Sequence, residues 1–243
     1  RHKAGQNVRQ AGEDIEAGQI VLAAGVKLTP AQIGLIASLG IAEVCVKTPL
    51  TVAVFSTGDE VLSIGDAPRE GCIYDSNRYS LLAALKKIGC RVLDMGIIVD
   101  DPDKLREAFE LASHSADVIF TSGGVSVGEA DYTKQVLSEA GAINFWKVAM
   151  KPGRPLAFGK ISNTTFFGLP GNPVAVMVTF YQFALPCLQK MMGISSPLIS
   201  PSITARCNSP IRKLAGRTEF QRGILSQGSD GEWEVRTTGQ QGS

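Results

Sequence analysis

The 243-residue chain has few of the residues that build common metal and catalytic sites. Its only histidines are His2 and His114, which argues strongly against histidine-based metal sites and Ser-His-Asp triads. Its cysteines are odd in number, scattered and never spaced as C-x-x-C, which argues against a disulfide framework or a cysteine zinc site and favours a reducing compartment. These cysteines are Cys45, Cys72, Cys90, Cys187 and Cys207.

An excess charge of one sign and a long hydrophobic run are also missing. With 24 basic and 23 acidic side chains the net charge is +1, so nothing electrostatic favours binding to nucleic acid or to an anionic membrane. The most apolar stretch, residues 174–188, contains Gln182 and Pro186 and is shorter than the roughly 20 residues of a bilayer span. The chain opens without Met and without an apolar signal region, and it ends at TTGQQGS. We therefore expect a fragment of a cytoplasmic protein.

The residues that are present predict a folded α/β protein. Hydrophobic residues make up 44% of the chain and charged residues 19%, which excludes a disordered chain. Strand and helix patterns alternate through the centre of the chain, and this predicts a three-layer, mostly parallel sheet with helices on both faces. We expect strands at 43–46, 51–56, 91–99, 117–121, 143–149, 156–161 and 165–169, and helices at 30–39, 76–88, 102–113, 132–140 and 173–192, the last kinked at Pro186.

The composition divides the chain into three sections. Residues 1–49 are expected to be a segment of an N-terminal domain, with one helix that Thr29 caps and Gly40 ends. Residues 50–195 carry the α/β pattern. Residues 196–243 hold proline breaks and short β-like stretches, and they predict a truncated small β domain.

Nearly every segment that is rich in charged, hydroxyl-bearing or glycine residues follows a predicted strand. In open α/β sheets ligands bind outside the carboxyl ends of the strands, so these segments are expected to converge on one rim. They are STGDE at 56–60, VDDP at 99–102, TSGGVSVGEADYT at 121–133, KVAMKPGRP at 147–155 and GLPGNP at 168–173.

The glycine-rich segment at 121–133 allows positive φ angles and close backbone approach, so its N–H groups can point at an anion. Because it is long and follows a buried strand, we favour a phosphate or pterin-type ligand over the alternative, a flexible turn in which Asp131 caps the next helix. It matches neither a Walker loop nor G-x-G-x-x-G. The candidate residues are Ser122, Gly123, Gly124, Ser126 and Gly128, with Thr57 and Gly58 of STGDE on the same rim.

Two further segments suit an anion. On a strand, Lys147 and Lys151 share one face and Arg154 follows, which favours an oxyanion or phosphate; the alternative is a solvated edge strand protected by lysine. In GLPGNP, Asn172 and Pro173 start a helix whose free N–H groups attract anions, and ordinary capping explains the same pair equally well.

Carboxylates follow three different strands. Glu60, Asp100 and Asp131 would repel one another at close range unless a cation lay between them. With phosphate nearby, Mg²⁺ is the natural cation. The alternative for carboxylates in such loops is turn chemistry, and we assign Asp59 and Asp101 to it.

Taken together, these motifs resemble the molybdopterin molybdenumtransferase family, which is also the family of the C-terminal domain of gephyrin. Any one segment is modest evidence, but the ordered set is specific and runs through the whole chain. It comprises GEDI and GQIVLAAGVKLTP, then STGDE, IYDSNR, GIIVDDP, SGGVSVGEADYT, WKVAMKPGRP, FFGLPGNPVA and EFQRG.

The resemblance implies an enzyme that takes adenylylated molybdopterin and molybdate, with Mg²⁺, and releases molybdenum–molybdopterin and AMP. The implied metal and phosphate ligands are Glu60, Asp100 and Asp131, and the implied bases beside phosphate or molybdate are Lys147 and Lys151. The implied closing loop is Pro170, Gly171, Asn172 and Pro173. Asp14 matches an acidic position that faces the partner's active site in a homodimer, and Arg222 matches an arginine of the last domain.

Three departures from the family stand out. Part of the N-terminal region is absent and the last β domain is short, and Arg154 stands where some members have lysine. The alternatives are the adenylyltransferase of the same pathway, which is also a conceivable partner, and a non-catalytic gephyrin-like scaffold. The flanking sections argue against the first, and the retained site residues argue against the second.

Overall fold

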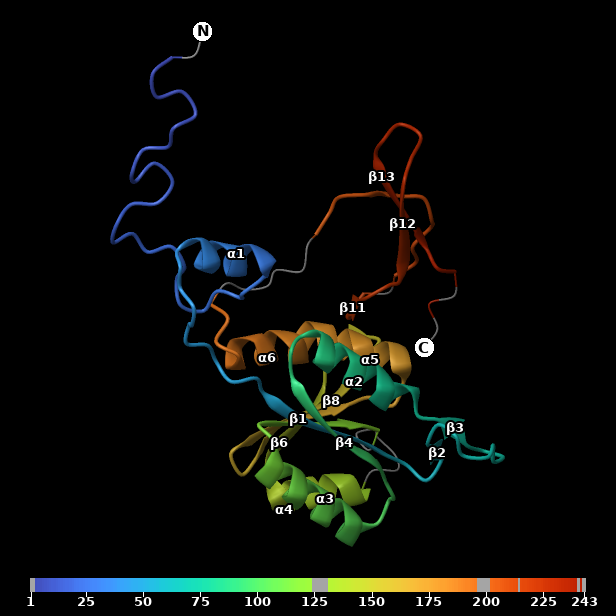
Figure 1. Ribbon diagram of the computed structural model, residues 1–243. Helices are drawn as coiled ribbons and strands as arrows, with labels where there is room; N and C mark the ends of the chain where they lie inside the picture. Colours follow the sequence, from blue (N-terminus) through green and yellow to red (C-terminus); the bar gives the residue numbers. More distant parts are fainter. Residues whose placement is uncertain (1–2, 124–130, 196–201, 214, 240, 242–243) are drawn as a thin grey trace.

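The computed structural model describes residues 3–123, 131–195, 202–213, 215–239 and 241. Its centre is a six-stranded sheet with the order β4-β1-β5-β9-β8-β6 (Figure 1). The first four strands in this order are parallel, and β8 runs antiparallel between β9 and β6. The bounds are β1 Thr51–Thr57, β4 Arg91–Ile98, β5 Val118–Ser122, β6 Gly141–Lys147, β8 Pro155–Ile161 and β9 Thr164–Leu169. The predicted mostly parallel α/β sheet is confirmed.

Helices cover both faces of this sheet (Figure 1). Two apolar cores result, one on each face. On one face lie α2 (Ser76–Lys87), α5 (Pro173–Thr179) and α6 (Leu185–Met191). On the other lie α3 (Pro102–Ser115) and α4 (Asp131–Ala140).

The central strands are buried on both sides, which is why they appear in the sequence as continuous apolar runs rather than as alternating patterns. Phe109 contacts Phe55 and Phe166 edge to face, with ring centroids 5.2 and 5.7 Å apart. On the opposite face Phe120 stacks on Phe167 at 5.1 Å. The aromatic rings therefore join the sheet to α3 on one face and two neighbouring strands to each other on the opposite face.

The long helix predicted at 173–192 is three consecutive segments. A π-helical turn, η1 (Phe180–Ala184), separates α5 from α6, and Pro186 is the second residue of α6. Proline has no N–H to donate and its ring crowds the carbonyl four residues before, which here is within η1. The wider π turn accommodates that loss of one helical bond.

The predicted strand at 143–149 begins and ends earlier than expected, at Gly141 and Lys147. A separate short strand, β7 (Met150–Lys151), pairs with β11 (Thr218–Glu219) of the C-terminal section. The remaining strands are β2 (Val61–Leu62) beside β3 (Ile73–Tyr74), and a sheet of β10 (Arg206–Cys207), β13 (Trp233–Thr237) and β12 (Gly223–Gln227).

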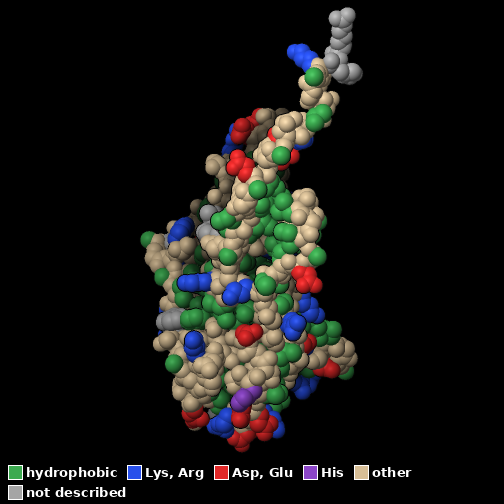
Figure 2. Space-filling model, turned by 60° about the vertical axis from the view of Figure 1, so that its left-hand side comes forward, with side chains coloured by type: hydrophobic (Ala, Val, Ile, Leu, Met, Phe, Trp, Pro, Cys, Tyr) green, Lys and Arg blue, Asp and Glu red, His purple; other side chains and the backbone are tan. Residues whose placement is uncertain are grey.

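The N-terminal section holds one helix, α1 (Pro30–Ser38), which starts with the predicted capping box: the backbone N–H of Thr29 donates to Gln32 Oε1 at 3.1 Å. The strand predicted at 43–46 was wrong, because its backbone finds no partner strand among the described residues. Many residues between Gln19 and Pro49 instead line a cavity of about 990 Å³, together with residues at the end of α6. Figure 2 shows hydrophobic side chains gathered on the side of the molecule that carries the N-terminal section.

No helix in the described ranges is both long and apolar enough to cross a membrane. Of the two histidines, His114 lies at the end of α3, among the charged side chains at one end of the molecule in Figure 2.

Candidate functional site

The structure brings the candidate segments to one edge of the six-stranded sheet. The parallel strands β4, β1, β5 and β9 end there, and they are followed by Asp100, by Gly58–Glu60, by Gly123 and by Pro170–Pro173. Strand β6 is antiparallel to β8, which is antiparallel to β9, so β6 also ends at this edge, with Lys147 opposite Pro155. We call this row of strand ends the carboxyl edge.

Acidic and basic side chains occupy opposite ends of the carboxyl edge. Asp100 follows β4 at one end of the sheet and Glu60 follows its neighbour β1, whereas Lys147 ends β6 at the other end. Neighbouring strands lie about 4.8 Å apart, so the five steps from β4 to β6 span roughly 24 Å. One ligand must be elongated to contact both ends.

Part of the predicted glycine-rich segment lies outside the described residues. This applies to Gly124, Ser126 and Gly128, and to the side chain of Asp131, whose backbone begins α4. Ser122 and Gly123 are described and stand between the acidic and basic ends, because β5 is a central strand.

Buried hydroxyl groups that find no hydrogen-bond partner in the described part of the chain lie at the middle of the edge. Ser56, Thr57 and Thr121 each have such a group. Side chains alternate along β1, so Ser56 lies on the α2 face with Val54, and Thr57 lies on the α3 face with Phe55. A buried hydroxyl that makes no hydrogen bond is unfavourable, so these groups are suited to receive a polar ligand.

Two glycines leave room for close approach at the same place. A Cβ on Gly123 would lie 2.7 Å from the backbone oxygen of Thr57, and the φ of Gly123 is +90°. A Cβ on Gly58 would lie 2.5 Å from a carboxylate oxygen of Glu60, so the Glu60 side chain folds back over Gly58. Only glycine fits position 123, because the neighbouring atom belongs to the backbone and cannot rotate away.

The loops at the acidic end are joined to each other. The backbone N–H of Asp100 lies 3.4 Å from Asp59 Oδ1, and Arg69 Nη2 donates to the backbone oxygen of Asp59 at 2.8 Å. Asp101 accepts hydrogen bonds from the N–H groups of Asp103 and Lys104 and caps α3. Turn and cap chemistry therefore accounts for Asp59 and Asp101, as the sequence suggested, while Glu60 and Asp100 stay exposed.

The GLPGNP loop is held from two sides. Asn172 Oδ1 accepts from the N–H groups of Val174 and Ala175 at 3.0 and 3.1 Å, which is ordinary N-capping of α5. The carbonyl of Gly171 accepts a 2.6 Å hydrogen bond from Asn77 Nδ2 in the first turn of α2. Sequence reasoning did not place Asn77 at the site, although the IYDSNR motif was a signal that contained it.

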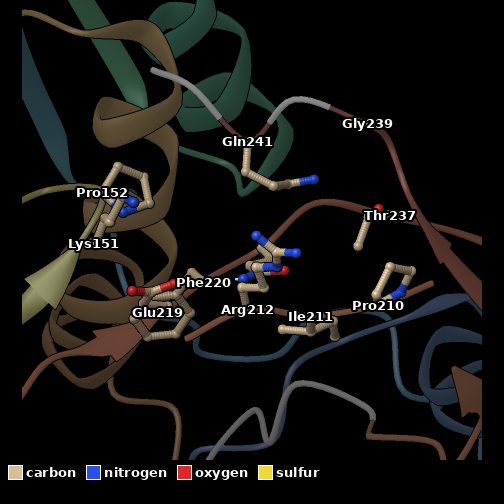
Figure 3. Close-up of a pocket in the computed structure, with 11 residues that line it drawn as sticks. Lys151, Pro152, Pro210, Ile211, Arg212, Glu219, Phe220, Thr237, Gly239 and Gln241 are labelled. Atoms are coloured by element: carbon tan, nitrogen blue, oxygen red, sulfur yellow. Dashed lines mark hydrogen bonds between the residues drawn. The ribbon is translucent and has the colours of Figure 1, made fainter. Parts of the chain in front are cut away.

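The basic end borders a cavity of about 180 Å³ between β7 and the C-terminal section. Lys151, Arg212 and Glu219 line it, and Figure 3 shows Arg212 and Gln241 reaching toward its centre. Lys147 and Lys151 are exposed. No pattern in the sequence singled out Arg212, because it lies far along the chain from the lysines.

Two predicted positions lie away from the carboxyl edge. Asp14 forms an ion pair with Arg9 on the exposed N-terminal segment, which Figure 1 shows extending beyond α1. The backbone of Arg222 is bound by Gln241, whose side chain both accepts from its N–H at 2.7 Å and donates to its carbonyl at 3.0 Å. Arg222 is not among the residues that line the cavity.

Cysteine chemistry has little support at this site. All the cysteines are free, and burial raises the pKa of the Cys90 thiol to about 11, so it stays protonated near neutral pH. Within the described ranges no group of three or more His, Cys, Asp or Glu side chains could hold a metal ion. A cation at the edge would therefore depend on ligand oxygens as well as on protein carboxylates.

Comparison with known proteins agrees with this arrangement. Residues 53–190 match the family described as the probable molybdopterin binding domain. The chain belongs to this molybdopterin-binding family. Residues 1–40 match the MoeA N-terminal region (domain I and II). The resemblance to molybdopterin molybdenumtransferases is confirmed.

Individual relatives of this family member cover nearly all of its length. The molybdopterin molybdenumtransferase of Haemophilus influenzae is 46% identical over 241 residues, which are 99% of this chain and 60% of that protein. Gephyrin of Dictyostelium discoideum is 36% identical over 268 residues, covering 96% of this chain and 36% of its own. The chain thus spans three fifths or less of these relatives.

Solved structures show the same architecture. The crystal structure of the molybdopterin biosynthesis MoeA protein from Pyrococcus horikoshii OT3 superposes with a TM-score of 0.76 at 27% identity, covering 96% of this chain and 55% of that one. A molybdenum cofactor biosynthesis protein from Pyrococcus furiosus gives 0.71 at 25% identity, covering 95% and 70%.

Proposed function

We propose that this chain is part of a molybdopterin molybdenumtransferase, which inserts molybdenum from molybdate into adenylylated molybdopterin and releases AMP. The observation that carries the proposal is the carboxyl edge, with Glu60 and Asp100 at one end, Lys147 at the other and the glycine backbone of Gly123 between them. A nucleotide-tagged pterin is long enough to contact both ends. The match of residues 1–40 to the MoeA N-terminal region favours this function over a single-domain adenylyltransferase.

The chain's own residues supply positioning and charge. Cleaving a phosphate anhydride needs charge neutralisation and alignment more than a strong protein nucleophile. Ser122 and Gly123, with the rest of the glycine-rich segment, would bind the pterin and phosphate region. Lys147 and Lys151 would neutralise phosphate or molybdate, and Arg212 adds a third positive group beside the cavity at Lys151.

Glu60 and Asp100 would hold the magnesium ion together with ligand oxygens. They are exposed carboxylates on the loops after two neighbouring strands, and the 3.4 Å approach between Asp100 and Asp59 holds these loops together. Mg²⁺ binds through one or two carboxylates together with phosphate oxygens and waters, and Asp131 is the proposed third acid. When bound, the ion would neutralise charge on the phosphates.

A homodimer and a cytoplasmic location belong to the same proposal. Asp14 lies on an exposed segment away from the edge of its own chain, as expected for a residue that serves a partner's site. The free cysteines fit a reducing compartment. The adenylyltransferase that makes the substrate would be a natural partner.

The test is AMP release by the full-length protein that contains this chain, given adenylylated molybdopterin, molybdate and Mg²⁺. We expect AMP release that depends on Mg²⁺, and a loss of at least about a hundredfold in Asp131→Asn, because a metal ligand is removed. Glu110→Gln is the matched control, since Glu110 is an exposed acid on α3 that lies more than two turns beyond the start of this helix at the edge. Absence of AMP release by the unaltered protein would refute the proposal.

A further inference from the structure

Asn77 stands out among the polar residues near the carboxyl edge because the proposed reaction gives it no task. It is the second residue of α2, two positions after the N-cap Asp75, and only 9% of it is exposed. Its neighbours Ser76 and Ser80 form ordinary helix contacts, with Ser80 Oγ donating to the Ser76 carbonyl. Asn77 instead points its amide across to a loop 94 residues further along the chain.

The orientation of this amide follows from its partner. A carbonyl oxygen only accepts hydrogen bonds, and the Gly171 carbonyl lies 2.6 Å from one end of the Asn77 amide. That end must be the NH₂ group, because an oxygen there would face another oxygen. The other end of the amide, Oδ1, therefore takes no part in the contact with Gly171.

Asn77 Oδ1 is buried and has no hydrogen-bond partner among the described residues. Leaving an amide oxygen unpaired inside a protein is unfavourable, and such atoms are few in folded structures. An amide oxygen can only accept, so the missing partner must be an N–H or O–H donor. Ser56 Oγ, also unpaired, lies on the same face of the sheet, at the end of β1.

The turn that carries Asn77 is rigid. The next residue, Arg78, is 4% exposed; its Nε donates to Asp75 at 2.9 Å and its Nη1 donates to Asp94 on β4 at 2.5 Å. Burial would lower the pKa of Arg78, but the hydrogen bonds to Asp75 and Asp94 raise it above its ordinary value, so this charge persists. Asn77 therefore cannot easily turn away to satisfy Oδ1 in solvent.

We propose that Asn77 is a positioning and ligand-reading residue: its Nδ2 holds the GLPGNP loop through Gly171, and its Oδ1 accepts a hydrogen bond from a neutral N–H or O–H donor of the bound substrate. This inference rests on the proposed function. The donor belongs either to the nucleotide, as a ribose hydroxyl or adenine amino group, or to the pterin ring. The acids, bases and backbone amides of the edge recognise charge, whereas Asn77 would recognise this neutral part.

The test measures the affinity of the full-length protein for AMP and, separately, for a free reduced pterin by calorimetry. In Asn77→Ala we expect about tenfold weaker binding of whichever ligand carries the donor, and unchanged binding of the other. Ser80→Ala, an exposed change on the same helix, is the matched control and should bind both ligands normally.

Asn77→Asp separates the two roles and also serves if Asn77→Ala does not fold. It keeps an oxygen toward the ligand but loses the N–H that holds Gly171, so exchange of the backbone amides of Gly171, Asn172, Val174 and Ala175 should quicken while affinity stays above that of Asn77→Ala. Equal affinity of the unaltered protein and Asn77→Ala for both ligands would overturn this inference alone. Failure of the unaltered protein to bind either ligand would overturn the proposed function with it.

Discussion

Gly123 shows how the backbone of the carboxyl edge requires one particular residue. Two requirements meet there: a φ of +90°, and a backbone oxygen of Thr57 that would lie 2.7 Å from any Cβ. The first requirement makes a side chain strained, and the second leaves it no space. The two can be separated experimentally, because Gly65 has a similar φ of +92° with no atom within 4 Å of its Cβ position.

We predict that Gly123→Ala lowers the free energy of unfolding by clearly more than Gly65→Ala, which should cost about 1 kcal/mol for its backbone angle alone. The reason is that the Thr57 carbonyl is part of a buried strand and cannot move aside. Urea unfolding measures both variants, and calorimetry with AMP should show loss of binding only in Gly123→Ala. An equal loss of stability in the two variants would show that the contact with Thr57 is unimportant.

At the scale of elements, the short pair β7 and β11 joins the C-terminal section to the site. The N–H of Thr218 donates to the Ala149 carbonyl and the N–H of Phe220 to the Lys151 carbonyl, both at 2.8 Å. Lys151 is thereby set opposite Glu219, beside the cavity that Arg212 enters (Figure 3). The backbone that carries Lys151 is therefore positioned by residues nearly 70 places away.

We predict that Thr218→Pro weakens the binding of phosphate or molybdate by about tenfold, because proline removes the N–H bonded to Ala149 and frees the strand that carries Lys151. Thr218→Val is the control, since it keeps the N–H and a similar shape on an exposed residue. Equilibrium dialysis of molybdate compares the two variants. Equal binding by both would mean that Lys151 is placed without β11.

At the scale of the whole molecule, burial is very uneven. All buried residues in the described part of the chain lie between Val52 and Leu188, so the segments before and after contribute none. Residue 25 contacts the end of the α/β section through its carbonyl, which accepts from the N–H of Ser195 at 3.1 Å. We propose on this basis that residues 1–49, 50–195 and 196–243 are separate sections, and that both apolar cores belong to the middle section.

Native-state hydrogen exchange tests this division. We predict that amides of β1, β5 and β9 exchange only by global unfolding, because both faces of these strands are buried, whereas residues 3–28 exchange fastest. Slow exchange in residues 3–28 would contradict the division. The same exchange data should place the boundary between the first two sections near residue 50, and the experiment needs no added ligand.

Local patterns predicted much of this molecule. The apolar runs that became β1, β5 and β9, the caps Thr29 and Asn172, and the positions of STGDE, VDDP and GLPGNP after strand ends were all visible in short windows of sequence. The prediction of a strand at 43–46 was wrong because a strand needs a neighbouring strand to pair with, and a short window of sequence does not show whether one is present. The π turn before Pro186 is a similar case, because the proline predicted an irregularity but not its form.

The sequence by itself determined the layers of the fold and the chemical character of each loop, because both follow from which residues are neighbours along the chain. Only the tertiary structure decided the order of strands across the carboxyl edge, which sets acids and bases at opposite ends. It alone also brought Asn77 to Gly171 and β11 to Lys151. These contacts join residues far apart in sequence, and their geometry exists only once the strands have paired and the helices have packed on them.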